Sequence, residues 1–243
     1  PAIRGEHGNV PRHERALVSD SRNLVATAAS HAAAAGRKLE AEMNTNKLLD
    51  FIFNLEGRGD FNIVWGGIKK SDYPKRPITT MTIGEVLDWQ DSIDKKYRSE
   101  AAGAPQILED TLRGLWKEAG LQLSSLFDEK GQRKLAEALL RRRGLIAYME
   151  GKISTETFAN NLAHEWASLP LVSGPRKGRG VYDGDGLNKS LTKVKDFVAA
   201  VESVKAIPPV RPDVEPVTPQ PAAAWWWNAL WKIFEQFTRK WRV

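Results

Sequence analysis

Two neighbouring segments decide the fold: Leu48-Leu49-Asp50-Phe51-Ile52-Phe53-Asn54-Leu55-Glu56-Gly57 and, after three intervening residues, Phe61-Asn62-Ile63-Val64-Trp65-Gly66-Gly67. The helical spacing of the apolar residues in the first segment predicts a helix that Gly57 ends. The second segment predicts a short strand and a turn. A glutamate that ends an apolar helix suits glycoside hydrolysis, because protonating a glycosidic oxygen requires a carboxylic acid with a raised pKa. A glutamate before glycine is also common at solvated helix ends, so spacing alone leaves the role of Glu56 open.

Further helices are predicted on the C-terminal side of this region. Thr82 opens one of them, since Glu85 three residues later completes a capping box. The predicted helices after residue 80 are Thr82–Ser92, Pro105–Ala119, Lys130–Arg142, Ser154–Ala167 and Leu191–Val204. Pro105 is expected at the first position of its helix, and the cap near Ser154 is ambiguous by a residue or two.

Composition narrows the classes of function. The 243 residues are 42% hydrophobic and 27% charged, which is typical of a globular protein, and the net charge is +6. The chain has no cysteine, and its four histidines contain no pair at the i, i+4 spacing of a helical metal site. We therefore expect no metal and no metal-dependent peptidase or amidase. No apolar run approaches the roughly 20 residues that span a bilayer, and we see no signal-peptide core.

Four regions differ in composition. Residues 1–44 are read as an N-terminal arm with an Ala-rich helix, and residues 45–205 as the main domain. Residues 206–221 are a proline-rich linker, because prolines exclude regular helix and favour an extended spacer. Residues 222–243 are predicted to form an amphipathic helix rich in tryptophan.

The last region is predicted to bind a membrane interface or a partner. Trp-rich basic amphipathic helices lie in membrane interfaces, whereas the alternative is docking on a protein surface. We expect an anionic membrane or a partner protein as its binding surface. The residues expected to make the contact are Trp225, Trp226, Trp227, Trp231, Phe234 and Trp241.

The main domain resembles a known family. Leu55-Glu56-Gly57 with Phe61–Gly67 resembles the "SEG…YNVIFGG" signature of the phage lambda endolysin-like muramidases and lytic transglycosylases. Other segments resemble later motifs of that family, in the same order: Asp72-Tyr73-Pro74, Pro77–Val86, Ala101-Ala102-Gly103, Phe127-Asp128 with Gln132 and Leu135, Arg143-Gly144, Leu162–Pro170 and Tyr182–Lys189. The last three are similar to the variant found in phages and prophages of α-proteobacteria.

This resemblance implies an α+β, mainly α, lysozyme-like domain with a small β-hairpin beside the cleft. It implies cleavage of the β-1,4 bond between N-acetylmuramic acid and N-acetylglucosamine, with Glu56 as the catalytic acid/base. Peptidoglycan would be the partner, with no nucleic acid and no cofactor. The Trp-rich region would then bind an anionic membrane, lipopolysaccharide or phage tail proteins. The protein would act at the periplasmic wall, from the host cell during phage lysis or from the virion. Water and the muramyl 6-hydroxyl both remain open as the attacking group.

The resemblance also implies a substrate groove. Its expected lining residues are Trp65, Gly66, Tyr73, Thr79, Gln106 and Tyr182. Inverting and retaining glycosidases need a second carboxylate, for which Asp60 and Asp72 are the candidates. The alternative role for both is structural: a turn residue for Asp60 and an Asx-type cap for Asp72.

One departure from the family gives weight to a different function. Where the family has Gly-Arg-Tyr-Gln, this chain has Gly103-Ala104-Pro105-Gln106. The arginine and tyrosine are expected to line the groove, so their replacement weakens the expected substrate contacts. The alternative is therefore a virion tail component, or a peptidoglycan-binding one, that keeps a lysozyme-like fold with little activity.

Overall fold

The computed structural model describes residues 30–31, 34–36, 42, 44–186 and 188–205. The chain divides into two units, Pro1–Ile207 and Pro208–Val243, and every described residue belongs to the first. The described residues of the N-terminal arm are helical. The predicted linker and the predicted Trp-rich helix, with its six contact residues, lie outside the described residues.

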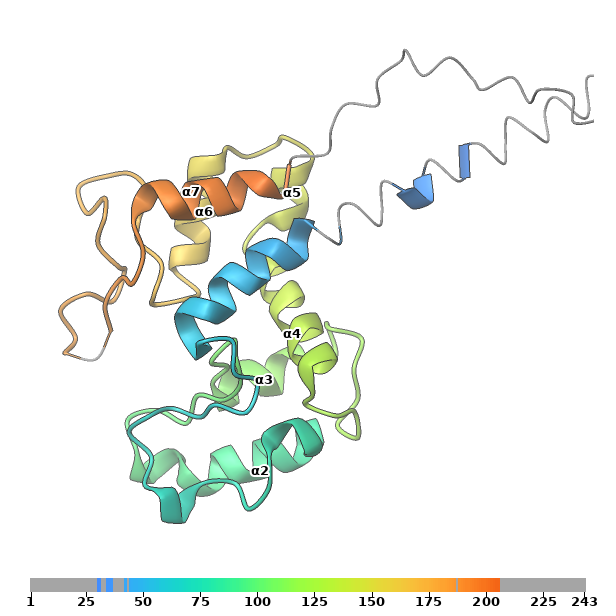
Figure 1. Ribbon diagram of the computed structural model, residues 1–243, viewed down its shortest axis with the longest axis vertical. Coiled ribbons are helices and arrows are strands. Elements are labelled where there is room, and N and C mark those ends of the chain that lie inside the picture. The colour runs from blue at the N-terminus through green and yellow to red at the C-terminus, as the bar shows by residue number, and fades with distance from the viewer. Residues whose placement is uncertain (1–29, 32–33, 37–41, 43, 187, 206–243) are drawn as a thin grey trace, which may run out of the picture. The chain divides into compact units, whose positions relative to one another are not determined.

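The first unit is mainly helical, as predicted (Figure 1). A helix over residues 44–57 comes first. It is followed by α2 (Ile83–Ile93), α3 (Glu109–Leu115), α4 (Glu129–Arg142), α5 (Leu145–Met149), α6 (Thr155–Ala163) and α7 (Val194–Ser203). Three short 3-10 helices, Lys70–Asp72, Ile78–Thr80 and Asp94–Lys96, lie before and after α2. Each helix from α2 to α7 packs on the next one along the chain.

Helix 44–57 contacts both α7 and α4. In Figure 1 it is the blue helix between α7 and α4. The rings of Phe51 and Phe197 stack at 6.3 Å, which ties it to α7, and Asp50 pairs with Arg133 of α4 at 2.7 Å. Four of its apolar side chains, Leu48, Leu49, Ile52 and Phe53, are buried in the core, where each contributes about 1.5–3 kcal/mol. The middle of this helix is therefore held from two sides.

Local capping signals place three helices. The predicted capping box of α2 is present in both directions between Thr82 and Glu85. Asp128 caps α4 through the Gly131 N–H, and Ser154 caps α6 through the Thr157 N–H, which settles the ambiguous cap. Each cap satisfies an N–H that has no partner within the helix.

The predicted start of α3 at Pro105 is wrong. Ala102 and Ile107 exchange both backbone hydrogen bonds, at 3.1 and 3.0 Å, and close a tight turn that contains Pro105. Gln106 in this turn has φ +51°, which is incompatible with a right-handed helix. The helix therefore begins at Glu109, after the turn.

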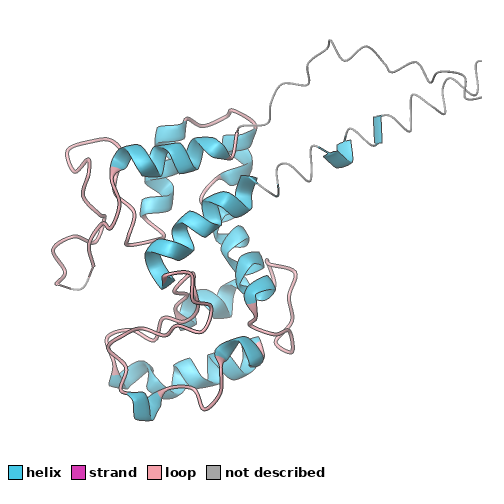
Figure 2. Ribbon diagram, in the orientation of Figure 1, coloured by secondary structure: helices cyan, strands magenta, loops and turns pink. Residues whose placement is uncertain are grey.

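The predicted β-hairpin is not found among the described residues, where strand pairing is limited to isolated bridges (Figure 2). The predicted strand Phe61–Trp65 is a turn at its start and pairs only at Val64, opposite Ala102. Two backbone bonds flank this bridge, from Trp65 N–H to Ala101 O and from Gly103 N–H to Ile63 O. A pairing this short forms no ladder.

Candidate active site

The helical spacing of residues 44–57 places Glu56 on the buried face. Leu48, Leu49, Ile52 and Phe53 form the apolar stripe, and each is at most 2% exposed. Glu56 follows Ile52 by four residues and Phe53 by three, so it continues the same stripe. A carboxyl group is thus placed where the pattern would otherwise put an apolar side chain.

The helix ends at Gly57, as predicted, but Gly57 itself does not take the left-handed conformation of a glycine cap. The helix runs through Gly57, and the left-handed residues are Arg58 (φ +55°) and Gly59 (φ +70°). Gly57 is instead required for close packing, because a Cβ there would lie 2.6 Å from Ala104 Cα and 2.7 Å from Ala104 O. The end of the helix therefore rests directly on the backbone of the 103–106 turn.

The 103–106 turn is fixed by Gln132 of α4, which is fully buried. Its side-chain oxygen accepts the Ala104 N–H at 2.9 Å, and its side-chain nitrogen donates to Phe61 O at 2.8 Å and Phe127 O at 2.9 Å. One side chain thus joins α4, the turn beneath Gly57 and the loop that follows Glu56. This arrangement holds the surroundings of Glu56 rigidly.

The Glu56 side chain is half-buried and has no charged partner among the described residues. Ser168 donates its backbone N–H to Glu56 Oε1 at 3.1 Å. Burial raises the pKa of Glu56, while the Ser168 hydroxyl and N–H beside it act in the opposite direction. No cation pairs with Glu56 in the described part of the chain. Burial therefore favours the protonated carboxyl, the state that a general acid needs.

Ser168 belongs to the site because it contacts Glu56, and the sequence predicted no role for it. It is 3% exposed, and its hydroxyl oxygen makes no hydrogen bond of regular geometry within the described residues. Its segment is anchored on both sides: Leu191 donates to Ser168 O at 2.8 Å, and the Trp166 indole donates to Pro105 O at 3.2 Å. A weak signal existed, because Ser168 is a small polar residue in an otherwise apolar run.

Strained backbone marks the same place. Among the described residues, Arg58 and Gln106 are the non-glycine residues with positive φ, at +55° and +51°. Arg58 directly follows Gly57, and Gln106 lies two residues after Ala104, on which Gly57 packs. Such conformations cost about 1–3 kcal/mol each and cluster at functional sites.

The two candidate second carboxylates are engaged elsewhere. Asp60 is exposed and accepts the Asn62 N–H at 2.8 Å, which is the turn role considered above. Asp72 accepts the Tyr97 hydroxyl at 2.6 Å, and this bond, followed by Lys96 nearby, lowers the pKa of Asp72. Neither carboxyl is a hydrogen-bond partner of Glu56.

Four of the predicted groove residues surround the turn and the loop beside Glu56. Gln106 is half-buried and donates to Gly103 O at 2.9 Å. Thr79 donates its N–H and its hydroxyl to Asn62 Oδ1, at 3.1 and 2.9 Å. Trp65 is half-buried with its ring over Gly67, and Gly66 is exposed.

The two predicted groove tyrosines, Tyr73 and Tyr182, are 40% and 41% exposed. Tyr182 donates its hydroxyl to His164 O at 2.8 Å, just beyond α6 and near the Ser168 segment. Tyr73 lines a pocket of about 420 Å³ together with Asp72 and Trp89, and Glu56 does not line this pocket. The structure brings Tyr182 to the segment that contacts Glu56 and places Tyr73 at this separate pocket.

Neither a metal site nor a membrane-spanning helix occurs among the described residues. These residues contain no group of three or more side chains suited to hold a metal ion. No helix within them has the length and apolarity to cross a bilayer.

Comparisons of this chain with models of protein families, with curated proteins and with solved structures find no match.

Proposed function

We propose that this chain cleaves the glycan strands of peptidoglycan, with Glu56 as general acid/base in a lysozyme-like domain. The scissile bond is the β-1,4 bond between N-acetylmuramic acid and N-acetylglucosamine, cut during phage lysis or during wall penetration by a virion. The observation that carries this proposal is the half-buried Glu56 carboxyl, whose pKa is raised by desolvation and which pairs with no cation among the described residues. Three other carboxyls, Asp72, Glu85 and Glu118, have lowered pKa values. Each accepts hydrogen bonds from its neighbours, and these outweigh the effect of burial.

The proposed reaction begins with protonated Glu56. Its proton passes to the glycosidic oxygen as the bond from that oxygen to the sugar carbon breaks, and the bonding electrons leave with the oxygen. The new Glu56 carboxylate keeps the Ser168 N–H as a hydrogen-bond donor, and the Ser168 hydroxyl lies beside it. The carboxylate then takes a proton from the attacking hydroxyl group, which closes the cycle.

We favour chemistry that uses one carboxylate. Asp60 accepts a hydrogen bond within its own turn, and Asp72 is bonded to Tyr97 with Lys96 nearby, so both candidates have structural partners other than Glu56. With a single carboxylate, the muramyl 6-hydroxyl attacks in place of water, and the product is a 1,6-anhydro end. This is the outcome of a lytic transglycosylase.

A specific observation keeps the binding alternative in view. Ala104 is fully buried under the end of helix 44–57, and Pro105 is buried beside Trp166. Neither residue presents a side chain to a ligand. A virion component that binds the wall without cutting it would tolerate this loss better than an enzyme would.

Turbidity clearance of purified peptidoglycan tests the proposal. Wild type should clear the suspension and Glu56→Gln should not, because the amide keeps the Ser168 hydrogen bond but cannot donate a proton as an acid. Asp60→Asn is the matched control, which removes a nearby carboxyl and should leave clearance unchanged. Equal clearance by wild type and Glu56→Gln would refute the catalytic role, and no clearance by either would favour binding without cleavage.

A further inference from the structure

The described arginines fall into two groups. Six of them form ion pairs with carboxylates: Arg76, Arg113, Arg133, Arg141, Arg142 and Arg143. Within the described residues, four have no carboxylate partner: Arg58, Arg98, Arg176 and Arg179. An arginine without a carboxylate partner is available for a negatively charged ligand.

Two of these four charges are already used by the protein's own backbone. Arg176 donates to the carbonyl oxygens of Val181 and Gly180 at 3.0 and 2.9 Å, and so holds its loop together. Arg98 donates to Asp185 O at 3.4 Å. Arg58 and Arg179 are exposed, and no hydrogen bond from either guanidinium is present among the described residues.

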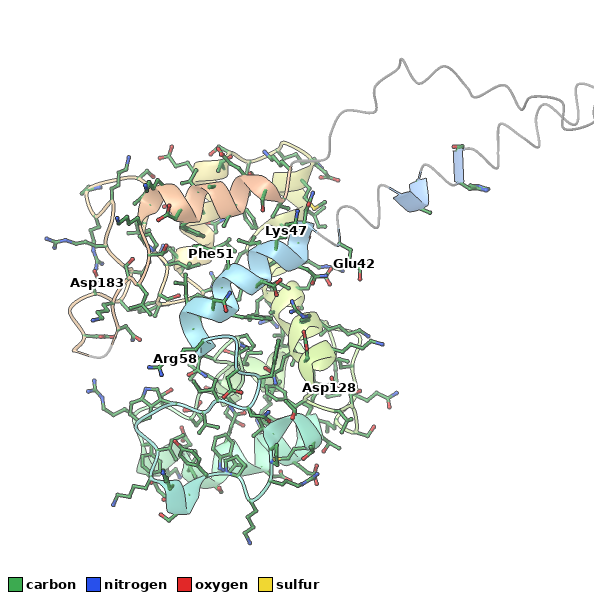
Figure 3. The ribbon with its side chains drawn as sticks, in the orientation of Figure 1. Glu42, Lys47, Phe51, Arg58, Asp128 and Asp183 are labelled. Atoms are coloured by element: carbon green, nitrogen blue, oxygen red, sulfur yellow. The ribbon has the colours of Figure 1, made fainter. Side chains whose placement is uncertain are left out.

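Arg58 lies at the end of the helix that carries Glu56, and the backbone of Arg179 pairs with the segment that follows Ser168. Arg58 is two residues after Glu56, and its side chain points away from the end of the helix (Figure 3). Arg179 accepts the Leu171 N–H on its backbone oxygen at 2.8 Å, and Pro170 pairs with Gly180. Residues 170–171 directly follow Ser168 and Leu169, so the backbone at Arg179 lies against the continuation of the segment that contacts Glu56.

The backbone at Arg58 carries a further observation. Its φ of +55° is a conformation in which glycine is favoured, and a larger side chain there costs stability. A charged and exposed side chain in a strained turn, without a partner among the described residues, is suited to bind a ligand. The polymer proposed as substrate carries free carboxylates on its stem peptides, close to the sugars.

We propose that Arg58, with Arg179 as a second cation, binds the stem-peptide carboxylates of the glycan strand and selects carboxylate-bearing over neutral glycan. This inference rests on the proposed function, because it places the strand at Glu56. A guanidinium presents a planar fork that matches a carboxylate with two hydrogen bonds. A lipid phosphate would also attract the charge, and the experiment below separates that source.

Co-sedimentation with insoluble purified sacculi tests the proposal. The full chain carrying Glu56→Gln is used, so that the substrate stays intact, with and without Arg58→Gln. Gln106 already has a positive φ, so glutamine is a residue type that tolerates this backbone. Arg58→Gln should weaken binding about three- to fivefold at low salt, the effect of losing an exposed ion pair of good geometry, and the difference should shrink as salt screens the charge.

Two controls isolate the carboxylates. Arg141→Gln makes the same change in net charge at an arginine already paired with Glu137, and it should leave binding unchanged. On sacculi whose carboxyls have been converted to amides, Arg58→Gln should bind as well as its parent. Vesicles of anionic phospholipid provide the lipid arm, where Arg58→Gln should have no effect.

The outcomes are distinct. Equal loss from Arg58→Gln and Arg141→Gln, an equal loss on amidated sacculi, or a loss on vesicles alone would overturn the inference. Clearance by wild type reports on the proposed function separately. Clearance without Arg58-dependent binding would overturn this inference only, and Arg58-dependent binding without clearance would overturn the proposed cleavage only.

Discussion

Replacing Gly57 with alanine tests the packing on which the site depends. The added Cβ would lie 2.6, 2.7 and 3.1 Å from three backbone atoms of Ala104. Since these atoms cannot rotate away, the helix end and the 103–106 turn must separate. Overpacking of this kind costs about 1–3 kcal/mol and occasionally more, and we take about 3 kcal/mol because only backbone is available to yield. Alanine regains at most about 1 kcal/mol of helix propensity, so the expected net loss is about 2 kcal/mol.

Gly114→Ala is the matched control. Gly114 lies within α3, and a Cβ there would meet only the end of the Arg142 side chain, at 3.8 Å. Alanine at this position should stabilise the protein by up to about 1 kcal/mol. The free energies of unfolding, measured by urea denaturation, should therefore differ by about 3 kcal/mol between the two variants. If Gly57→Ala is as stable as Gly114→Ala, the close approach of the helix to Ala104 does not exist, and the reasoning about the Glu56 site fails with it.

Four further predictions follow from the same contacts. Burial raises the pKa of Glu56 above its ordinary value of 4.5, so the folded state loses stability as pH rises from 4.5 through the folded pKa. Glu56→Gln removes this loss, and its advantage in melting temperature should grow from near zero below pH 4.5 to a maximum at neutral pH; a pH-independent difference would contradict the burial. Because the Ser168 hydroxyl lowers the pKa of Glu56, Ser168→Ala should move the alkaline limb of the clearance profile to higher pH, and an unmoved limb would exclude the hydroxyl from the site. Gln132→Ala leaves two buried backbone groups and one half-buried one without their partner, and a loss of about 3 kcal/mol is expected by urea denaturation, whereas a loss under 1 kcal/mol would show that the turn is held by other contacts. Arg58→Gly relieves the positive φ and should raise the free energy of unfolding by about 1 kcal/mol, so destabilisation would argue against strain.

Local signals predicted much of the helical part of the fold. The capping box at Thr82 and the cap at Ser154 each act within three residues, so the residues that form them are visible in the sequence. The sequence also contains the signal that places Glu56 on the inner face of its helix, because its spacing from Ile52 and Phe53 continues the apolar stripe. These features depend on neighbours along the chain and not on the tertiary arrangement.

The features that could not be predicted from the sequence depend on residues that are distant along the chain. A proline at the start of a helix and a proline in a tight turn look alike in sequence, and only the pairing of Ala102 with Ile107 separates them. The reason for Gly57 lies in Ala104, 47 positions away by residue number, and the hydrogen-bond donor to Glu56 lies 112 residues along the chain. No local pattern encodes such contacts.

The central claim is that Glu56 supplies the proton that breaks a glycosidic bond. Mass spectrometry of the soluble products released from purified sacculi measures this directly. Wild type should release muropeptides cut between N-acetylmuramic acid and N-acetylglucosamine, with 1,6-anhydro ends that are one water lighter than hydrolysed ones, and Glu56→Gln should release none. The same glycan fragments from both proteins, or fragments cut only in the peptide stems, would contradict the account.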